Sequence, residues 1–580
     1  MSGYKQINTT GSSSSLLRHS GYSATEHSGT DSPYSSVANR TSGVGTISGQ
    51  FSLPPDPNRW GANLSPFVSE ADDDLHDPKR PDRLSNPFAS RAIANLGCLL
   101  VLCAAILMLF LGYPIITYAN KISRERSGFN AALGVNASGQ VPAMTGNWGL
   151  IDKDTPDDAY TFTSMRDGSD WQLVFSDEFN TDGRTFYPGD DPFWEAVDLH
   201  YWGTNNLEWY DPAAITTEDG SLVITLSKKE THDLHYQGGM MATWNKFCFT
   251  GGMIQTSVQL PGINNVVGLW PAIWAMGNLG RAGYGATLDG MWPYTYDNCD
   301  VGTAPNQTLN GLPTAAAQDG PADSNFALSY LPGQRLSRCT CNGESHPGPK
   351  HKDGSFVGRG APEIDIFEAQ VLEAKEEGQV SQSGQWAPFN DKYVWKNTSD
   401  NLIINDPTIS QLNTYIGGST QQATSVVTKT NQQCYQLADT PCFSTYGFEY
   451  KPGFDDAYIS WMSDGKQAWT INDAGVGPDD AVEIAARPVP QEPMYLIMNL
   501  GMSENFGTVD LTHLTFPAKM KVDWIRVYQD PKQINIGCDP KDFPTSEYIA
   551  TYYEAYNNPN LTTWEEFGQT FPKNSFLGQC

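Results

Sequence analysis

The sequence predicts an all-β domain, an antiparallel sandwich or barrel, over roughly residues 170–530. From about Trp171 onward, short runs rich in Val, Ile, Phe, Tyr and Trp alternate with Gly, Pro, Asn and Asp. These runs include WQLVFSDEF, SLVITLSK, MIQTSVQL, GLWPAIWAM, YISWMSDG and MKVDWIRVY. No long amphipathic helical pattern competes with them, and the chain's 16 Trp supply large apolar side chains for a core.

The chain before this domain has a different composition. Residues 1–91 are rich in Ser, Gly and Thr and lack a sustained apolar period, so they predict a disordered tail. Within residues 92–118, the run LGCLLVLCAAILMLFLGYPII carries no charge. It is long enough to cross a hydrocarbon layer of about 30 Å, which predicts one transmembrane helix. It is not a cleavable signal peptide, because a long tail precedes it.

Cysteines and glycosylation sequons predict the orientation of this membrane segment. Eight of the ten cysteines follow it, an even number suited to disulfides, which form in oxidising compartments. Four sequons also follow it, at Asn136, Asn306, Asn397 and Asn560. We therefore expect a single-pass type II protein of the secretory pathway (endoplasmic reticulum or Golgi) and plasma membrane, with a cytosolic tail. The stem (119–168), the domain (169–530) and a C-terminal extension (531–580) would be luminal or extracellular.

The distribution of charge excludes one class of partner. The formal net charge is −29. Residues 1–91 carry eight Lys/Arg and nine Asp/Glu, whereas the rest of the chain carries 28 and 56. Because an acidic surface repels phosphate backbones, we do not expect nucleic acid binding.

A long insertion interrupts the domain at residues 278–360. It is rich in Gly, Pro, Asn and Asp, and a loop of this length is usually functional or separately stabilised. Its cysteines are Cys299, Cys339 and Cys341, with His346 and His351 close behind. Zinc is one alternative, but the C-x-C-x4-H-x4-H spacing is unfamiliar, so disulfides are favoured. The aromatic residues Trp292, Tyr294 and Tyr296 are candidate platforms for stacking on sugars.

The run EIDIFE at 363–368 carries the chemistry. On a strand Glu363 and Asp365 share one face, while Glu368 would face the core, which is costly for a carboxylate. A β-bulge near Ile366–Phe367 returns Glu368 to the acidic face. Neighbouring carboxylates raise the pKa of at least one of the group, so that one carboxyl can stay protonated while another is charged. A retaining glycosidase needs this pair, one as the nucleophile and one as the acid/base. The alternative is an exposed edge strand with a solvated acidic face.

These six residues resemble the E-x-D-x-x-E signature of glycoside hydrolase family 16 in its bulged, laminarinase-like form. Other segments resemble the family in the same order: LVFSDEF (173–179), NNLEWY (205–210), GLWPAIWAMG (268–277), TYGFEY, ISWMSDG and KVDWIRVYQ (521–529). The hydrophobic anchor, WPYTYDNCD (292–300) and SQSGQWAPF (381–389) resemble fungal cell-wall proteins of β-1,6-glucan synthesis, the killer-toxin-resistance type. The resemblance implies a jelly-roll sandwich.

The resemblance also implies roles for particular residues. Glu363 would be the nucleophile, Asp365 its electrostatic modulator and Glu368 the acid/base. The sugar cleft would be lined by Asn205, Asn206, Trp209, Trp244, Trp270, Trp274, Trp292, Gln385 and Trp386. No cofactor is expected beyond a structural calcium at Asp523. The alternative for the Trp residues is plain core packing.

Two functions from different classes follow. The first is a membrane-anchored retaining glucanase or transglucosylase that acts on cell-wall β-glucan beside the glucan-synthesis machinery. The second is a non-catalytic β-glucan-binding or scaffold protein. Many laminarinases have a His in the segment matching 381–389, where this chain has Gln382, Gln385 and Trp386. This difference argues against ordinary β-1,3-glucan hydrolysis.

Overall fold

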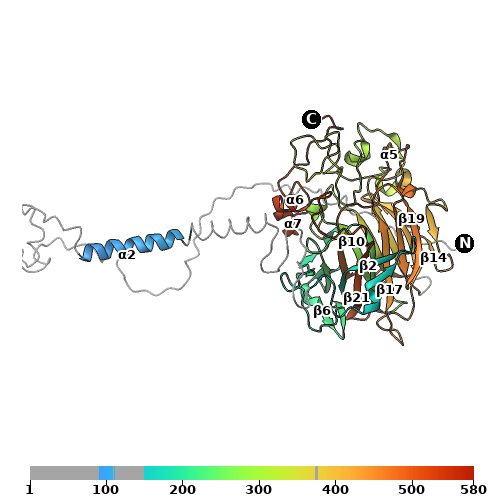
Figure 1. Cartoon of the computed structure of the whole chain (residues 1–580), viewed down its shortest axis with the longest axis horizontal. Helices are drawn as coiled ribbons and strands as arrows, with labels where there is room; N and C mark the ends of the chain where they lie inside the picture. The colour runs from blue at the N-terminus through green and yellow to red at the C-terminus, as the bar shows by residue number, and fades with distance from the viewer. Residues whose placement is uncertain (1–89, 109, 111–148, 373–376) are drawn as a thin grey trace, which may run out of the picture. The chain divides into compact units, whose positions relative to one another are not determined.

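The computed structural model describes residues 90–108, 110, 149–372 and 377–580 (Figure 1). Most of the predicted tail, of the stem and of the second half of the membrane segment lies outside these residues, as does the sequon at Asn136. Helix α2 (Ser90–Leu107) belongs to a separate unit from the β-sheets. Within the described residues, no helix combines the length and hydropathy needed to span a bilayer. The membrane anchor therefore stays a prediction.

The domain consists of two large sheets. The first has the order β1 (Thr161–Thr163), β2 (Asp170–Asp177), β21 (Ala518–Gln529), β9 (Gly252–Gln259), β17 (Ser444–Lys451), β18 (Tyr458–Ser463), β19 (Lys466–Asn472) and β13 (Leu402–Ile404); β7 (Ser221–Leu226) pairs with β21, and β6 (Ile215–Glu218) with β7. Strand β1 begins within the predicted stem, so the domain extends further toward the N-terminus than the sequence indicated.

The second sheet carries the EIDIFE strand near its middle. Its order is β14 (Ser410–Leu412), β16 (Gln421–Lys429), β12 (Glu377–Trp386), β11 (Glu363–Leu372), β10 (Trp270–Gly277), β20 (Met494–Gly501), β8 (Tyr236–Ala242), β5 (Glu208–Tyr210) and β4 (Leu199–His200); β15 (Gly417–Gly418) pairs with β16, and β3 (Glu195–Ala196) with β8. Every pairing is antiparallel except β5 with β8. Because β11 has neighbours on both sides, it is not the exposed edge strand of the alternative interpretation.

The main core lies between the two sheets. Ile254 of β9 and Phe448 of β17 come from the first sheet, and Ile273 of β10 and Ile364 of β11 from the second; all four are fully buried in one apolar cluster. Trp461 of β18 reaches across and donates its indole N–H to the backbone oxygen of Asp365 (2.8 Å). The predicted antiparallel sandwich is confirmed, since two sheets face each other across a shared apolar layer.

The remaining helices of the domain are short. The α-helices are α4 (Gly285–Leu288), α5 (Thr314–Gln318), α6 (Ser546–Thr551) and α7 (Tyr553–Asn557). The 3-10 turns are η4 (Asp157–Tyr160), η5 (Trp202–Thr204), η6 (Pro212–Ala214), η7 (Val301–Thr303), η8 (Pro305–Gln307), η9 (Ala322–Ser324), η10 (Asp391–Tyr393) and η11 (Asp473–Val476).

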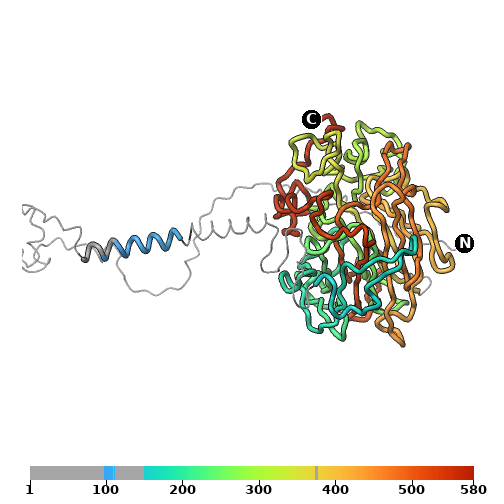
Figure 2. The backbone as a smooth tube through the Cα atoms, in the orientation of Figure 1, coloured from blue at the N-terminus to red at the C-terminus, as the bar shows by residue number. Residues whose placement is uncertain are grey.

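The insertion and the C-terminal extension pack on each other. Figure 2 shows the red end of the chain running beside the green and yellow insertion. The Cys341–Cys580 disulfide joins them, and the amide of Ala286 donates to the oxygen of Leu561 (2.9 Å). The two segments therefore form one covering layer, although more than 150 residues of sandwich separate them in the sequence.

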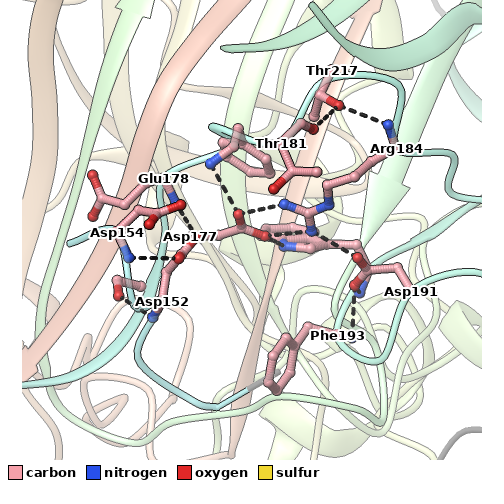
Figure 3. Close-up of polar contacts among 12 residues, drawn as sticks. Asp152, Asp154, Asp177, Glu178, Thr181, Arg184, Asp191, Phe193 and Thr217 are labelled. Atoms are coloured by element: carbon pink, nitrogen blue, oxygen red, sulfur yellow. Dashed lines mark hydrogen bonds and ion pairs between the residues drawn. The ribbon is translucent and has the colours of Figure 1, made fainter. Parts of the chain in front are cut away.

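Figure 3 shows a buried ion cluster that fixes the chain after β2. Arg184 lies 2.7 Å from a carboxylate oxygen of both Asp177 and Asp191. Trp194 donates to Asp177 as well (3.1 Å), and nearby the side chain of Asp152 accepts from the amides of Asp154 and Glu178. Paired charges of this kind hold the segment in place, and we assign the cluster a structural role.

Candidate active site

A β-bulge on β11 brings the three carboxylates to one face of the second sheet, which we call the carboxylate face. Glu363, Asp365 and Glu368 pair with alternate residues of β12, namely Gln385, Ser383 and Ser381. They also pair with alternate residues of β10, namely Met276, Trp274 and Ala272. From Asp365 to Glu368 the chain advances three residues along β11, whereas each neighbouring strand advances only two. The extra residue reverses the alternation, as a bulge does.

The bulge also settles where the apolar residues go. Ile364, Ile366 and Phe367 are fully buried in the sheet–sheet core, and Phe367 contacts the Tyr446 ring at 4.9 Å between centroids. Phe367 pairs with Ile273 of β10, and Ile366 is the inserted residue. The bulge predicted near Ile366–Phe367 is confirmed.

Two indole groups contact the outer carboxylates. The Trp292 Nε1–H donates to Oε2 of Glu363 (2.6 Å). The Trp270 Nε1–H donates to Oε1 of Glu368 (3.0 Å), and Phe506 stacks on the Trp270 ring at 4.3 Å. Each glutamate is half-buried. One oxygen of each is thus held by a fixed donor, which sets the direction of the other.

Burial dominates the titration of the site. It raises the pKa of Glu363 to about 8, and the charge of Glu368 adds to the rise. Burial likewise raises the pKa of Glu368 to about 8, with a further contribution from the charge of Asp365. The pKa of each glutamate is thus raised mainly by burial, and the like charges that the sequence predicted make a smaller contribution.

Asp365 is the most enclosed of the three, with 1% of its surface exposed. It accepts from Nε2 of Gln385 (3.0 Å) and hydrogen-bonds Glu363. Burial, followed by the charge of Glu363, raises the pKa of Asp365 well above its usual range. The bond between the two acids lowers the pKa of Glu363 while raising that of Asp365. When the two acids share one proton, this bond therefore favours the proton on Asp365 over Glu363.

Other aromatic residues lie beside the two glutamates. Tyr201 lies close enough to Glu363 for that charge to add to the effect of burial, which raises the pKa of Tyr201. Tyr415 has the same relationship to Glu368, and its hydroxyl accepts from Gln421 Nε2 (2.7 Å). Tyr415 comes from the strand connection after β14, and Phe506 from the one after β20. Sequence reasoning missed these three residues, because no local pattern marks a loop residue that folds back over a distant strand.

A fourth carboxylate, Glu208 of β5, is completely buried. It accepts from the side-chain amide of Asn206 (2.6 Å) and from the backbone amide of Met502 (2.9 Å). Burial raises the pKa of Glu208 to about 7. Asn206 also donates to the hydroxyl of Tyr210 (3.0 Å). The i, i+2, i+4 spacing of these three side chains in NNLEWY was a signal that the sequence reading did not use.

The structure brings three of the predicted cleft residues to the carboxylates: Trp270, Trp292 and Gln385. Trp274 pairs with Asp365 in register but is buried, and its indole donates to Oδ1 of Asn499 (2.8 Å). The side chain of Asn206 donates to Glu208 and Tyr210 rather than to the carboxylates of β11.

The remaining predicted cleft residues lie elsewhere. Trp209 lies on β5, and three strands, β8, β20 and β10, separate β5 from β11. The Trp209 indole donates to Asp198 (2.6 Å). Asn205 is exposed beside the 3-10 turn η5. Trp244 stacks on Tyr556 of the C-terminal extension.

Several aromatic predictions need correction. Trp386 is 1% exposed, lies in the sheet–sheet core and donates to Thr424 (2.8 Å). Because Gln385 faces the carboxylates, the next residue on the strand must face the other way. Tyr294 and Tyr296 are fully buried in an apolar cluster of the insertion, so they are not sugar platforms.

The eight cysteines after the hydrophobic segment form four disulfides, as predicted. The pairs are Cys248–Cys538, Cys299–Cys339, Cys341–Cys580 and Cys434–Cys442. Cys339 and Cys341 therefore bond to other cysteines, which contradicts the zinc alternative. Cys98 and Cys103 on α2 are not bonded.

The structural calcium ion expected at Asp523 stays a prediction. The carboxylate of Asp523 accepts from the hydroxyl of Ser257 (3.5 Å). The neighbouring Glu178 is already bound by the Arg526 guanidinium (2.7 Å) and by Thr155 (3.0 Å). Among the described residues, no three His, Cys, Asp or Glu side chains converge in a way that could hold a metal.

Comparison with known proteins places the chain in a family. The model of the beta-glucan synthesis-associated SKN1/KRE6/Sbg1 proteins matches residues 63–580. The chain belongs to this family. Its KRE6 relative in Candida albicans is 42% identical over 511 residues, which cover 87% of this chain and 64% of that protein. The KRE6 relative in Saccharomyces cerevisiae is 39% identical over 593 residues, which cover 100% of this chain and 77% of that protein. The chain thus spans less than two thirds of the Candida protein.

Solved structures give a weaker likeness. The laminarinase catalytic domain from Thermotoga petrophila covers 62% of this chain with 98% of its own length, at 20% identity and a TM-score of 0.35. The endo-β-1,3-glucanase from Pyrococcus furiosus covers 65% of this chain with 98% of its own length, at 18% identity and a TM-score of 0.36. Scores this low do not establish a shared fold, and the sandwich follows here from the strand pairing itself.

Proposed function

We propose that this protein is a retaining glucanase or transglucosylase that acts on cell-wall β-glucan. The observation that carries the proposal is the bulge, because it returns Glu368 to the face that bears Glu363 and Asp365. A retaining glycosidase needs two carboxyl groups on one face, one ionised and one protonated. The names of the relatives supply the substrate class, since they are β-glucan synthesis-associated proteins.

In this mechanism an oxygen of ionised Glu363 attacks C1 of a glucosyl residue while the glycosidic C1–O bond breaks. Glu368 gives its proton to the leaving oxygen. A hydroxyl group then attacks C1, the ester to Glu363 breaks, and Glu368 takes the proton of the attacking group. Water gives hydrolysis and a sugar hydroxyl gives transfer. We expect transfer to predominate at high sugar concentration, because the aromatic rings beside the glutamates can hold an acceptor sugar in the attacking orientation.

The anchor and the compartment are part of the same proposal. We infer a type II membrane protein whose residues from about 119 onward face the secretory lumen or the cell exterior. The four disulfides support this orientation, since they form in oxidising compartments. There the domain would reach β-glucan beside the machinery that makes it.

A second candidate is a non-catalytic glucan-binding or scaffold protein. The feature that favours it is the occupation of both glutamates by the indoles of Trp292 and Trp270. The test incubates the full chain in detergent with linear β-1,3- and β-1,6-gluco-oligosaccharides and analyses the products by mass spectrometry. Products from the wild type but not from Glu363→Gln support the enzyme. Binding without products from either would favour the scaffold.

A further inference from the structure

Side chains fill the carboxylate face on the β10 side of the glutamates. Residues that share this face by register are Trp274, Met276, Tyr495, Ile497, Met240 and Ala242, and all are buried. They belong to one apolar cluster with Tyr284 and Met291 of the insertion and with Tyr548, Tyr556 and Trp564 of the C-terminal extension. The covering layer therefore rests directly on this half of the face.

The β12 side is also covered. Ser381, Ser383, Ser425 and Val427 share the face by register, and all are at most 5% exposed. Ser383 donates to Ser425 (2.8 Å), and Asn413 from the connection after β14 donates to Ser425 as well (3.1 Å). Two residues further along, Tyr415 lies beside Glu368. This connection thus folds over the second half of the face.

What stays partly exposed is a short aromatic frame around the two acids. Its members are Trp270, Trp292, Tyr201, Tyr415 and Phe506, all half-buried like Glu363 and Glu368 themselves. Aromatic rings suit the apolar faces of sugar rings. An enzyme that cuts within a polymer needs exposed surface for several sugars on both sides of the bond. Here the strands on both sides are covered.

Building on the glucan-active function proposed above, we propose that the site accepts only the end of a glucan chain. The terminal sugar enters at the two glutamates, and the rest of the chain leaves toward solvent through the frame. A chain lying across the face would have to displace the covering layer, which Cys341–Cys580 and Cys248–Cys538 hold in place. The specificity is thus for chain ends, whichever linkage is used.

The test compares linear with cyclic β-glucans of the same β-1,3 and β-1,6 linkages, because a cyclic glucan has no end. With the full chain in detergent, we expect linear glucans to be consumed at least 100-fold faster than cyclic ones. Comparable consumption of both would overturn the proposal.

A binding measurement keeps this inference separate from the enzyme hypothesis. Glu363→Gln retains the shape of the site without its negative charge, so sugar binding can be titrated without turnover. Linear glucan bound at least tenfold more tightly than cyclic glucan supports end recognition, even when the wild type turns over neither. Equal binding, or no binding of the linear glucan, would overturn it.

Discussion

The indole nitrogen of Trp292 lies 2.6 Å from Oε2 of Glu363, although 71 residues separate the two in the sequence. Trp292 belongs to the insertion and Glu363 to the second sheet. The insertion therefore does more than cover the sandwich, because one of its side chains fixes the proposed nucleophile. This bond lowers the pKa of Glu363, against the larger effect of burial.

Replacing Trp292 tests this relationship. Trp292→Phe keeps a ring but removes the N–H donor, so the pKa of Glu363 should rise further. Because the nucleophile must be ionised, the acidic limb of the kcat/KM profile should move to higher pH. Trp209→Phe is the control, since its indole donates to Asp198 instead. An acidic limb that stays in place in Trp292→Phe would argue against the role of the bond.

The two glutamates should be separable from the fold. Glu368→Gln removes the proton donor, and loss of general acid catalysis lowers rates by about 10²–10⁴-fold. Glu363→Gln removes the nucleophile and should abolish turnover. Glu377→Gln on the neighbouring strand β12 is the matched control and should stay active. Full activity in both triad variants, measured on linear gluco-oligosaccharides, would refute the enzyme hypothesis.

Stability should depend on pH because of the same acids. The pKa of Glu363 and that of Glu368 are about 8 in the folded state, well above the ordinary glutamate value, so the folded protein binds protons more tightly. Their contribution to stability is fully present below about pH 4.5 and is lost as the pH rises from there through about 8. We expect the Tm to fall between pH 5 and 8, within the range from about 4.5 to 8 that these pKa values define. Glu363→Gln should reduce this fall and be more stable than the wild type at pH 8, whereas exposed Glu565→Gln should change neither.

Glu208 should matter for folding. Glu208→Ala leaves the amides of Met502 and Asn206 without their acceptor, and each unsatisfied buried donor costs about 1–3 kcal/mol. Glu208→Gln keeps one acceptor oxygen and should cost less. Urea unfolding at constant pH measures the difference. Equal stability of the alanine variant and the wild type would show that water replaces the carboxylate.

Glycosylation tests the orientation. Asn306, Asn397 and Asn560 are all exposed, so a luminal domain should carry glycans there. Replacing each Asn by Gln should remove one glycan's worth of mass on a denaturing gel. Asn39→Gln in the predicted cytosolic tail matches a sequon by sequence alone and should change nothing. The opposite pattern would reverse the topology.

The sequence by itself determined the sandwich, the bulge and the four disulfides. Each follows from a local property. Strands show in short runs of β-branched and aromatic residues, and the bulge follows because Ile364, Ile366 and Glu368 cannot otherwise all reach the right face. The even cysteine count predicted disulfides, although not their pairing.

Only the tertiary structure decided which aromatic residues meet the carboxylates. Gln385 and Trp386 were both assigned to the cleft, yet neighbouring residues on a strand face opposite ways, and the register placed Gln385 on the carboxylate face. Trp292 reaches Glu363 and Tyr415 lies beside Glu368 because loops fold back over the sheet, and Glu208 binds a loop that follows β20. Such contacts depend on how segments distant in the sequence cover one another. Local patterns of side-chain polarity do not carry that information.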